Sequence, residues 1–419
     1  MFRLTMHPAS EGDCLVLAWG DDADPHHAVI DLGRTKDYTA LRPWLTAARR
    51  IELFAISHID ADHIAGAMPM GRESAPPFTP ADVWFNGHAH LVAAKERMRS
   101  LEEQSVAQGN KLEKAIRTFG WPWNTAFGRG PVSVDSPEAK RSLDLAGGLR
   151  LTLLAPADHD LARLESVWNN WLQANRLREI DSDDDPATPA GLEAMGSINV
   201  EQLAAEPFHE DDEPPNGSSI AFLAEYDGKR VLLGADAHPS RIAASLTALG
   251  YGPQNRLKLD LFKLCHHGSK KNTSPALLAM LDCKRFAIST DGSKHDHPDA
   301  QAIARLLVQD RETPKTLYFN TRQPNALAWQ EADLQRDWAY ATVFPDAPPS
   351  RALPSTSEMP RQRPNAGSPQ KERTSMSEVT IIGIDLAKRV FQLHGARGDG
   401  LVVFRKKLSR GHVLAFFAQ

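Results

Sequence analysis

The sequence contains little cysteine: only Cys14, Cys265 and Cys283 occur among 419 residues. No two of them have CxxC spacing, which argues against a disulfide framework or a structural zinc knuckle. There is also no run of about 18 apolar residues, so we expect no membrane span. The first residues, MFRLTMHPASEGDC, lack the basic and apolar regions of a signal peptide. Low cysteine use is typical of the reducing cytoplasm, where we expect this protein to act.

Positive charge is not in excess either. The formal net charge is −5, so no global basic field favours nucleic-acid binding. The net charge does not exclude a local basic patch. Hydrophobic residues make up 42% and charged residues 24% of the chain, as in ordinary globular proteins. The length suits two domains, or one large domain with insertions.

The apolar patterns predict a mixed α/β fold. A strand pair is expected within residues 2–19, with a turn at Gly12 and Asp13, and a hairpin within 218–238 around Asp227 and Gly228. Further predicted strands cover 27–33, 51–58, 147–156, 259–267, 285–290 and 316–321, the last of which we expect to end the core. Predicted helices cover 37–50, 88–118, 158–180 and 240–249.

Three stretches have a different composition. Residues 181–217 are acidic and rich in proline and small residues, which favours a solvated loop. Residues 346–375 are dominated by Pro, Ser, Arg and Gln, which is typical of a disordered linker. Residues 376–419 again contain strand-like patterns, but they are too few for a stable domain without help.

Four potential metal ligands stand together in the stretch ISHIDADHIAG, residues 56–66. They are His58, Asp60, Asp62 and His63, and they follow the predicted strand 51–58. Imidazole nitrogens and carboxylate oxygens bind Zn²⁺ at about 2.0–2.2 Å. On a turn after a strand, alternate residues converge from one side, and a helix start can bring His63 inward. The pattern predicts a metal centre.

Further ligand types follow two later strands. Asp236 ends the hairpin, and His266 and His267 end the strand 259–267. Sites in layered α/β folds are built at such strand ends. We therefore expect these residues to complete the same centre.

The motif His58-x-Asp60-x-Asp62-His63 resembles the HxHxDH motif of the metallo-β-lactamase superfamily. Aspartate at the second histidine position resembles the metallo-β-lactamase-like domain of ComEC-type DNA-uptake proteins. Other segments resemble that group in the same order: EGDCLVL, AVIDLG, NGSSIAFLAEYDGKRVLLGADA, KLCHHGSKKNTS and ISTDGSKHDHPD. The resemblance spans about residues 1–322. It implies an αββα sandwich domain over 1–345, with helical insertions at about 88–146 and 158–213.

The resemblance also implies roles for these residues. His58 and Asp60 would bind a first metal, Asp62 and His63 a second, and Asp236 would bridge both. One of the two neighbouring histidines would complete the second metal's ligands. We favour His266, which leaves His267 as a catalytic or substrate contact, while Asp62 would also orient the nucleophile.

The usual third-motif histidine is missing, and Asn216 and Ser219 stand near its place. The sequence is therefore compatible with either one or two bound Zn²⁺ ions. Asp60 makes the ligand set harder than a second imidazole would, which shifts its preference toward Mn²⁺.

The implied chemistry is hydrolysis by metal-activated water. Ser269 and Lys270, followed by Lys271, come directly after the two histidines, and His297 lies in a later loop. Such donors and cations favour a phosphodiester, so we expect a phosphodiesterase or nuclease-type enzyme acting on nucleic acid or a nucleotide. Alternatives are hydrolysis of another ester, a lactone or a thioester, and a metal-poor binding or regulatory module of the same fold.

The end of the chain carries a second resemblance. IIGIDLAKRVFQLHGARGDG is similar to the start of the DEDD transposases of Piv-like insertion sequences, whose first catalytic aspartate lies on a strand of an RNase H-like fold. That residue would be Asp385, and Met376 stands where such a protein would start. Two-metal phosphoryl transfer needs several carboxylates, so we expect a truncated, inactive fragment. It would come from read-through into an inserted element, or alternatively from a genuine fusion.

Overall fold

The computed structural model describes residues 1–98, 107–140, 142–174 and 198–345, together with the backbone of three strands between residues 381 and 409. Contacts divide the chain into two units, Met1–Pro348 and Pro349–Gln419. The first unit ends close to the domain boundary expected at residue 345. The linker expected at 346–375 lies outside the described residues.

The first unit contains two large sheets and has the predicted α/β character. The five-stranded sheet has the order β1-β2-β3-β4-β5. Strands β1 to β3 pair antiparallel, whereas β3, β4 and β5 pair parallel. Its strands are β1 (Phe2–Met6), β2 (Leu15–Trp19), β3 (His26–Ile30), β4 (Ile51–Ala55) and β5 (Val83–Trp84).

The second sheet has eight strands in the order β15-β14-β13-β11-β9-β8-β7-β6. They are β6 (Leu143–Asp144), β7 (Arg150–Ala155), β8 (Ala221–Tyr226), β9 (Lys229–Leu233), β11 (Leu261–Lys263), β13 (Arg285–Ile288), β14 (Lys315–Phe319) and β15 (Tyr340–Val343). The expectation that residues 316–321 end the core was wrong, because β15 pairs parallel with β14 beyond them. A separate parallel pair is formed by β10 (Leu257–Leu259) and β12 (Leu281–Cys283).

Helices connect these strands. They are α1 (Thr35–Ala47), α2 (Ala61–Ile64), α3 (Ala67–Met70), α4 (His88–Met98), α5 (Ala107–Phe119), α6 (Asp158–Ala174), α7 (Val200–Ala204), α8 (Pro214–Gly217), α9 (Pro239–Ala248), α10 (Pro275–Ala279), α11 (Ala300–Val308), α12 (Pro324–Leu327) and α13 (Ala332–Asp337). The helix predicted for 88–118 coincides with α4 and α5, and residues 99–106 between them lie outside the described residues. The acidic stretch 181–217 is not only loop, because its described part contains α7 and α8.

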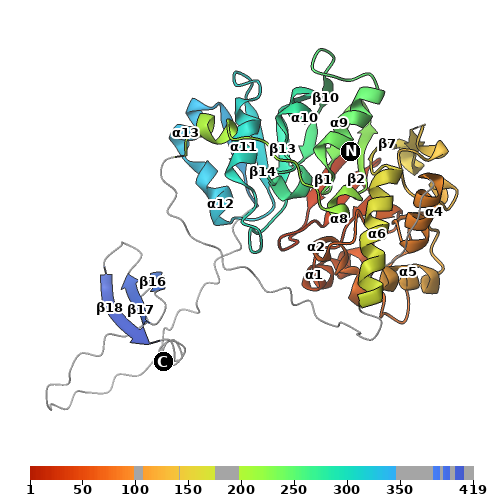
Figure 1. The fold of residues 1–419 in the computed structure, drawn as a ribbon, viewed down its shortest axis with the longest axis horizontal. Helices are drawn as coiled ribbons and strands as arrows, with labels where there is room; N and C mark the ends of the chain where they lie inside the picture. The colour runs from red at the N-terminus through yellow and green to blue at the C-terminus, as the bar shows by residue number, and fades with distance from the viewer. Residues whose placement is uncertain are drawn as a thin grey trace. The chain divides into compact units, whose positions relative to one another are not determined.

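Alternating side chains build three apolar layers. One cluster draws Leu17 and Leu53 from the first sheet and Leu151 and Phe222 from the second, so these faces pack together. A second cluster joins the outer face of the first sheet to α1, α4, α5 and α6. A third joins the outer face of the second sheet to α9, α10 and α11. Helices thus cover the outer face of each sheet (Figure 1).

The hairpin of β8 and β9 shows how local sequence fixes one of these pairs. Asp227 and Gly228 have φ values of 48° and 72°, the left-handed conformation that a two-residue turn of this hand requires. Asp-Gly adopts it at low strain, as predicted. The turn fixes the register in which β9 reaches the loop that carries Asp236.

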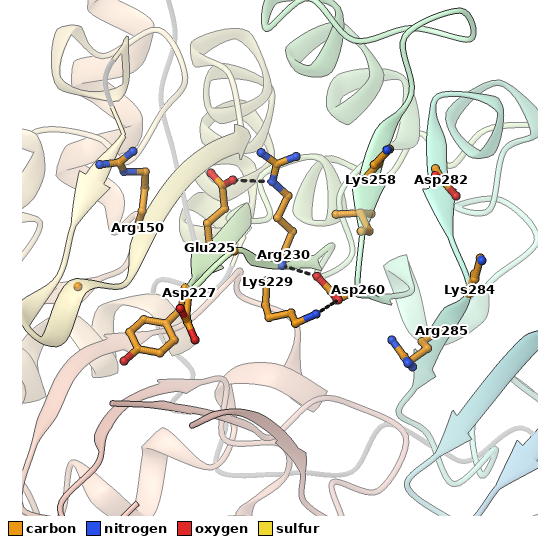
Figure 2. A pocket seen from close by; sticks show the side chains of 14 residues that line it. Arg150, Glu225, Asp227, Lys229, Arg230, Lys258, Asp260, Asp282, Lys284 and Arg285 are labelled. Carbon is orange, nitrogen blue, oxygen red and sulfur yellow. Dashed lines mark hydrogen bonds and ion pairs between the residues drawn. The ribbon is translucent and has the colours of Figure 1, made fainter. Parts of the chain in front are cut away.

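The amino ends of β9, β11 and β13 border a charged pocket of about 730 Å³ (Figure 2). Two ion pairs cross it. Lys229 Nζ lies 3.1 Å from Asp260 Oδ1, and Arg230 Nε lies 2.7 Å from Glu225 Oε1. All four side chains are partly exposed. The carboxyl ends of the same three strands lead to the histidine and aspartate cluster described below.

The described part of the second unit is a three-stranded antiparallel sheet of β16 (Ile381–Leu386), β17 (Val390–Ala396) and β18 (Val402–Ser409). Asp385 lies on β16 opposite Gln392. Among the described helices of the chain, none is long and apolar enough to cross a membrane.

Candidate metal centre

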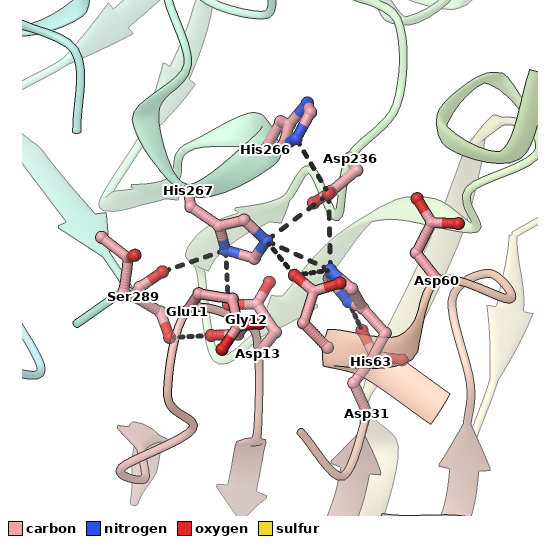
Figure 3. Close-up of polar contacts among 12 residues, drawn as sticks. Glu11, Gly12, Asp13, Asp31, Asp60, His63, Asp236, His266, His267 and Ser289 are labelled. Carbon is pink, nitrogen blue, oxygen red and sulfur yellow. Dashed lines mark hydrogen bonds and ion pairs between the residues drawn. The ribbon is translucent and has the colours of Figure 1, made fainter. Parts of the chain in front are cut away.

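Loops at one edge of both sheets bring the predicted ligands together (Figure 3). In the first sheet, Asp31 follows β3, and the residues from His58 to His63 follow β4. In the second sheet, Asp236 follows β9 and the two histidines follow β11. Because parallel strands end at the same edge, segments more than 200 residues apart in the sequence meet here.

The backbone at the centre is unusual. His266 and His267 have φ values of 45° and 54°, and Ala235, directly before Asp236, also has φ 45°. Residues with a Cβ seldom adopt this left-handed conformation, and such strain persists where the surrounding structure over-determines it. Here it allows two consecutive histidines to turn their rings toward the same carboxylate.

Four imidazole Nε2 atoms converge on Asp236 Oδ2. The distances are 3.4 Å for His63, 3.5 Å for His267, 3.7 Å for His266 and 3.8 Å for His58. The side chains of His58 and His63 are fully buried, and those of Asp236 and His267 nearly so. His58 Nε2 and Asp236 Oδ1 are buried without a hydrogen-bond partner.

The other ring nitrogens are held by acceptors. His63 Nδ1 lies 2.8 Å from Asp31 Oδ2, and His267 Nδ1 lies 3.0 Å from the Ser289 carbonyl oxygen. His266 Nδ1 faces Asp211 Oδ2 at 3.3 Å and Asn272 Oδ1 at 3.1 Å. With Nδ1–H donating to these acceptors, Nε2 of each neutral ring presents its lone pair to the centre.

These lone pairs face one another. The Nε2 atoms of His63 and His267 are only 3.2 Å apart, and Asp62 Oδ2 lies 3.2 Å from His267 Nε2. Acceptors packed so closely repel unless a proton or a metal cation lies between them. The donor set is therefore one that could hold a divalent cation.

The shifted pKa values of the histidines and of Asp236 likewise show that this cluster stabilises positive charge. Burial alone would lower the pKa of His63, but the carboxylates of Asp236, Asp62 and Asp31 raise it well above its ordinary value. Burial likewise opposes protonation of His267, yet Asp236 and Asp62 raise its pKa to about 10. The pKa of Asp236, which burial alone would raise, is held well below its usual range by the facing histidines.

The ligand atoms fall into compact groups. Asp62, His63 and His267 form one, and His58, His63 and Asp236 form another. The structure places His267, and not the favoured His266, beside Asp62 and His63. The reason is the sharp turn through both residues, which a sequence pattern does not specify.

Asp60 and His266 lie farther out. Asp60 Oδ2 is 3.6 Å from His58 Nε2, but its side chain is 41% exposed. His266 is 21% exposed, its Nε2 lies 3.7 Å from Asp236 Oδ2, and its ring lies edge-on to that of His267. Neither belongs to the compact groups found among the described residues.

Sequence reasoning missed three carboxylates. Asp13 and Asp31 each belong to a compact group, and their signal was a carboxylate next to a buried strand. Asp211 lies in the stretch predicted to be a solvated acidic loop, yet it is 4% exposed. It accepts a hydrogen bond from Asn216 Nδ2 at 2.7 Å. That prediction was wrong for Asp211, because the loop folds back over His266.

The predicted substrate contacts lie beside the centre in different environments. Ser269 is buried, and its hydroxyl accepts a hydrogen bond from the Lys271 amide at 3.2 Å. Lys270 is exposed, and its amide donates to Asp299. The His297 ring lies edge-on to His266, with centroids 5.3 Å apart.

No family model matches this chain, and no curated protein matches its sequence. Function must therefore be inferred from the geometry of the centre and from the residue patterns.

Proposed function

We propose that residues 1–345 form a metal-dependent hydrolase of the metallo-β-lactamase fold, similar to the ComEC-like branch, that cleaves phosphodiester bonds. Two facing sheets with helices on both outer faces agree with an αββα sandwich. The helices α4, α5 and α6 fall within the expected insertions. The cluster lies at the loop edge where such a fold would carry its site.

The main support for this proposal is the convergence of four histidine Nε2 atoms on Asp236 Oδ2. Asp62, His63, His267 and Asp236 would hold one Zn²⁺ or Mn²⁺ ion. His58 and Asp60, with Asp236 between the two sets and His266 at its far side, would hold a second. A bound divalent ion would supply a Lewis acid that activates water and stabilises developing negative charge.

The residues behind the ligands prepare this chemistry. Asp31, the Ser289 carbonyl and Asp211 each hold one histidine ring in the tautomer that presents Nε2. Such outer partners fix ligand orientation and raise ligand basicity. Asp62 is 18% exposed and lies 3.2 Å from His267 Nε2, so it would also orient a water molecule bound at this group.

Exposed cations beside the centre support an anionic substrate. Lys270 and Lys271 lie on the loop after His267, and both are exposed. A phosphodiester would place its negative oxygens toward these side chains while its phosphorus faces the centre. A neutral lactone or ester would gain little from them.

The test is phosphodiesterase activity of the purified protein with added Mn²⁺ or Zn²⁺. Single-stranded DNA, RNA, cyclic dinucleotides and bis(p-nitrophenyl) phosphate serve as substrates, beside a carboxylic ester and a lactone. Asp62→Ala should abolish metal-dependent turnover. Asp282→Ala, on β12 beside the charged pocket, should leave it unchanged. Turnover of the ester or lactone alone would replace the phosphodiester assignment.

A second candidate is a metal-poor binding or regulatory module of the same fold. It is favoured by the exposure of Asp60 and by its place outside the compact groups. Metal analysis separates the two candidates. Less than one bound ion per chain after dialysis against Zn²⁺ or Mn²⁺, with no effect of Asp62→Ala, would decide for the module.

For the second unit we propose a transposase-like segment, derived from an inserted element or a fusion. The strand position of Asp385 agrees with the resemblance. Deleting residues 349–419 should leave metal binding and turnover of the first unit unchanged. A loss of either activity on deletion would instead support a functional fusion.

A further inference from the structure

A buried lysine lies behind the candidate metal centre. Lys263, the last residue of β11, is 0% exposed. Its Nζ donates to Asp13 Oδ2 at 2.6 Å and to the Leu264 carbonyl oxygen at 3.1 Å. Lysine is almost never fully buried unless it is paired, because desolvating its charge is costly. This ammonium group therefore needs a physical reason to be here.

Asp13 links the lysine to the centre. One carboxylate oxygen is bound to Lys263, 250 residues away in the sequence. The other, Oδ1, is buried without a hydrogen-bond partner and lies 3.7 Å from His267 Nδ1. The pair also ties the two sheets together, because Asp13 precedes β2 and Lys263 ends β11.

Carboxylates crowd this centre, and Lys263 is the ammonium group buried among them. Asp13, Asp31, Asp211 and Asp236 are buried, and Asp62 is 18% exposed. Removing the lysine would add one uncompensated negative charge to this desolvated cluster.

We propose that Lys263 is the fixed counter-cation of this metal centre and that it acts through Asp13 as a positioning residue. By occupying Asp13 Oδ2, the ammonium group keeps that carboxylate beside His267 and out of the ligand set. The ammonium charge also offsets the charge of Asp13. The affinity for metal is therefore set by the remaining carboxylates and is lower than it would be with Asp13 uncompensated. The inference rests on the metal binding proposed above.

Opposite charge changes should move metal affinity in opposite directions. Lys263→Met removes the cation and keeps much of the apolar stem, so the dissociation constant for Zn²⁺ or Mn²⁺ should fall by about tenfold or more. Asp13→Asn leaves the ammonium group unbalanced beside the centre, so the constant should rise by about tenfold or more. The double variant restores the balance and should bind metal within about threefold of the wild type.

The dissociation constants are measured on the full chain by competition with a metal chelator, together with the melting temperature with and without metal. Lys95→Met is the matched control. Lys95 Nζ makes another buried pair, 2.7 Å from Glu165 Oε2, but on α4 and α6. This control should lower the melting temperature without changing the metal dissociation constant.

Each outcome decides the proposal. If Asp13 were itself a ligand, the double variant would bind metal as weakly as Asp13→Asn, and the proposal would be overturned. Unchanged constants in all three variants would show a purely structural pair and overturn it as well. If Lys263→Met does not fold, the double variant and Asp13→Asn still separate these cases. Failure of the wild type to bind metal would overturn the proposed function too, whereas wild-type binding with unmoved constants overturns this inference alone.

Discussion

The two ends of β9, β11 and β13 carry charged groups in opposite environments. At the amino ends, the pairs of Lys229 with Asp260 and Arg230 with Glu225 have side chains between 27% and 61% exposed. At the carboxyl ends, Asp236 and His267 are 3% exposed. Exposed pairs are solvated and contribute little, about 0–1 kcal/mol each. The buried cluster instead leaves lone pairs facing one another, so a cation bound there would stabilise it. Position along the same strands thus separates a solvated surface from a buried candidate site.

Disrupting the loops around the histidine and aspartate cluster should have the largest effect on stability and on metal binding. A Cβ on Gly12 would lie 1.9 Å from the Asp62 carbonyl oxygen, and Gly12 also accepts a hydrogen bond from Ser289 Oγ at 2.8 Å. Gly12→Ala must therefore separate the loop before β2 from the ligand loop. We expect a loss of about 3 kcal/mol in the free energy of unfolding, the upper end of the usual cost of overpacking, together with loss of bound metal. Thermal unfolding and metal analysis check this.

Gly252 supplies the matched control. A Cβ there would meet no heavy atom within 4 Å, so Gly252→Ala should change the free energy of unfolding by about 0.5 kcal/mol or less. A Gly12→Ala protein with wild-type stability and metal content would show that the two loops do not touch.

His90 is a buried histidine whose pKa, unlike those of His63 and His267, is not raised by neighbouring aspartates. His90 is 6% exposed and accepts a hydrogen bond from the Gly87 amide at 3.2 Å. Burial lowers the pKa of His90 to about 4, the opposite direction from His63 and His267. Below the ordinary pKa the unfolded chain binds the proton more readily, so stability is lost as pH falls from 6.5 toward 4. The loss should approach about 3 kcal/mol.

His90→Gln isolates this contribution, because glutamine retains an acceptor and does not titrate. Urea unfolding between pH 7 and pH 4 should show a steeper loss of stability for the wild type than for the variant. Parallel pH profiles would mean that His90 is not buried in its neutral form.

The sequence anticipated the elements whose signals are local. The apolar runs and the Asp-Gly turn predicted most strands, and the spacing of His58, Asp62 and His63 predicted that three candidate ligands share one turn. These signals work because a strand and the turn after it are contiguous in the chain. The same logic placed Asp236 at the end of β9.

The remaining features depend on contacts between distant segments. The sequence favoured His266, whereas the structure places His267 beside Asp62, because two positive φ angles decide which ring faces it. Asp211 looked like one acid in a solvated run, and only the folding of its loop over His266 buries it. Asp13 meets Lys263 across 250 residues, a pairing that no local pattern contains.

The smallest effect is expected at the amino ends. Asp260 accepts hydrogen bonds from Lys229 Nζ at 3.1 Å and from the Arg230 amide at 3.0 Å. Asp260→Asn removes the charge but keeps an acceptor, so the free energy of unfolding should change by about 1 kcal/mol or less. The difference should vanish in 1 M NaCl, where the Debye length is about 3 Å. Asp236→Asn, at the other end of the same sheet, should abolish metal binding at any salt concentration, because water and ions do not screen a desolvated ligand set. Thermal unfolding at low and high salt, with metal analysis of both variants, measures the contrast. If Asp260→Asn also lost metal, the two ends would be coupled through the strands, and the separation between solvated surface and ligand site would fail.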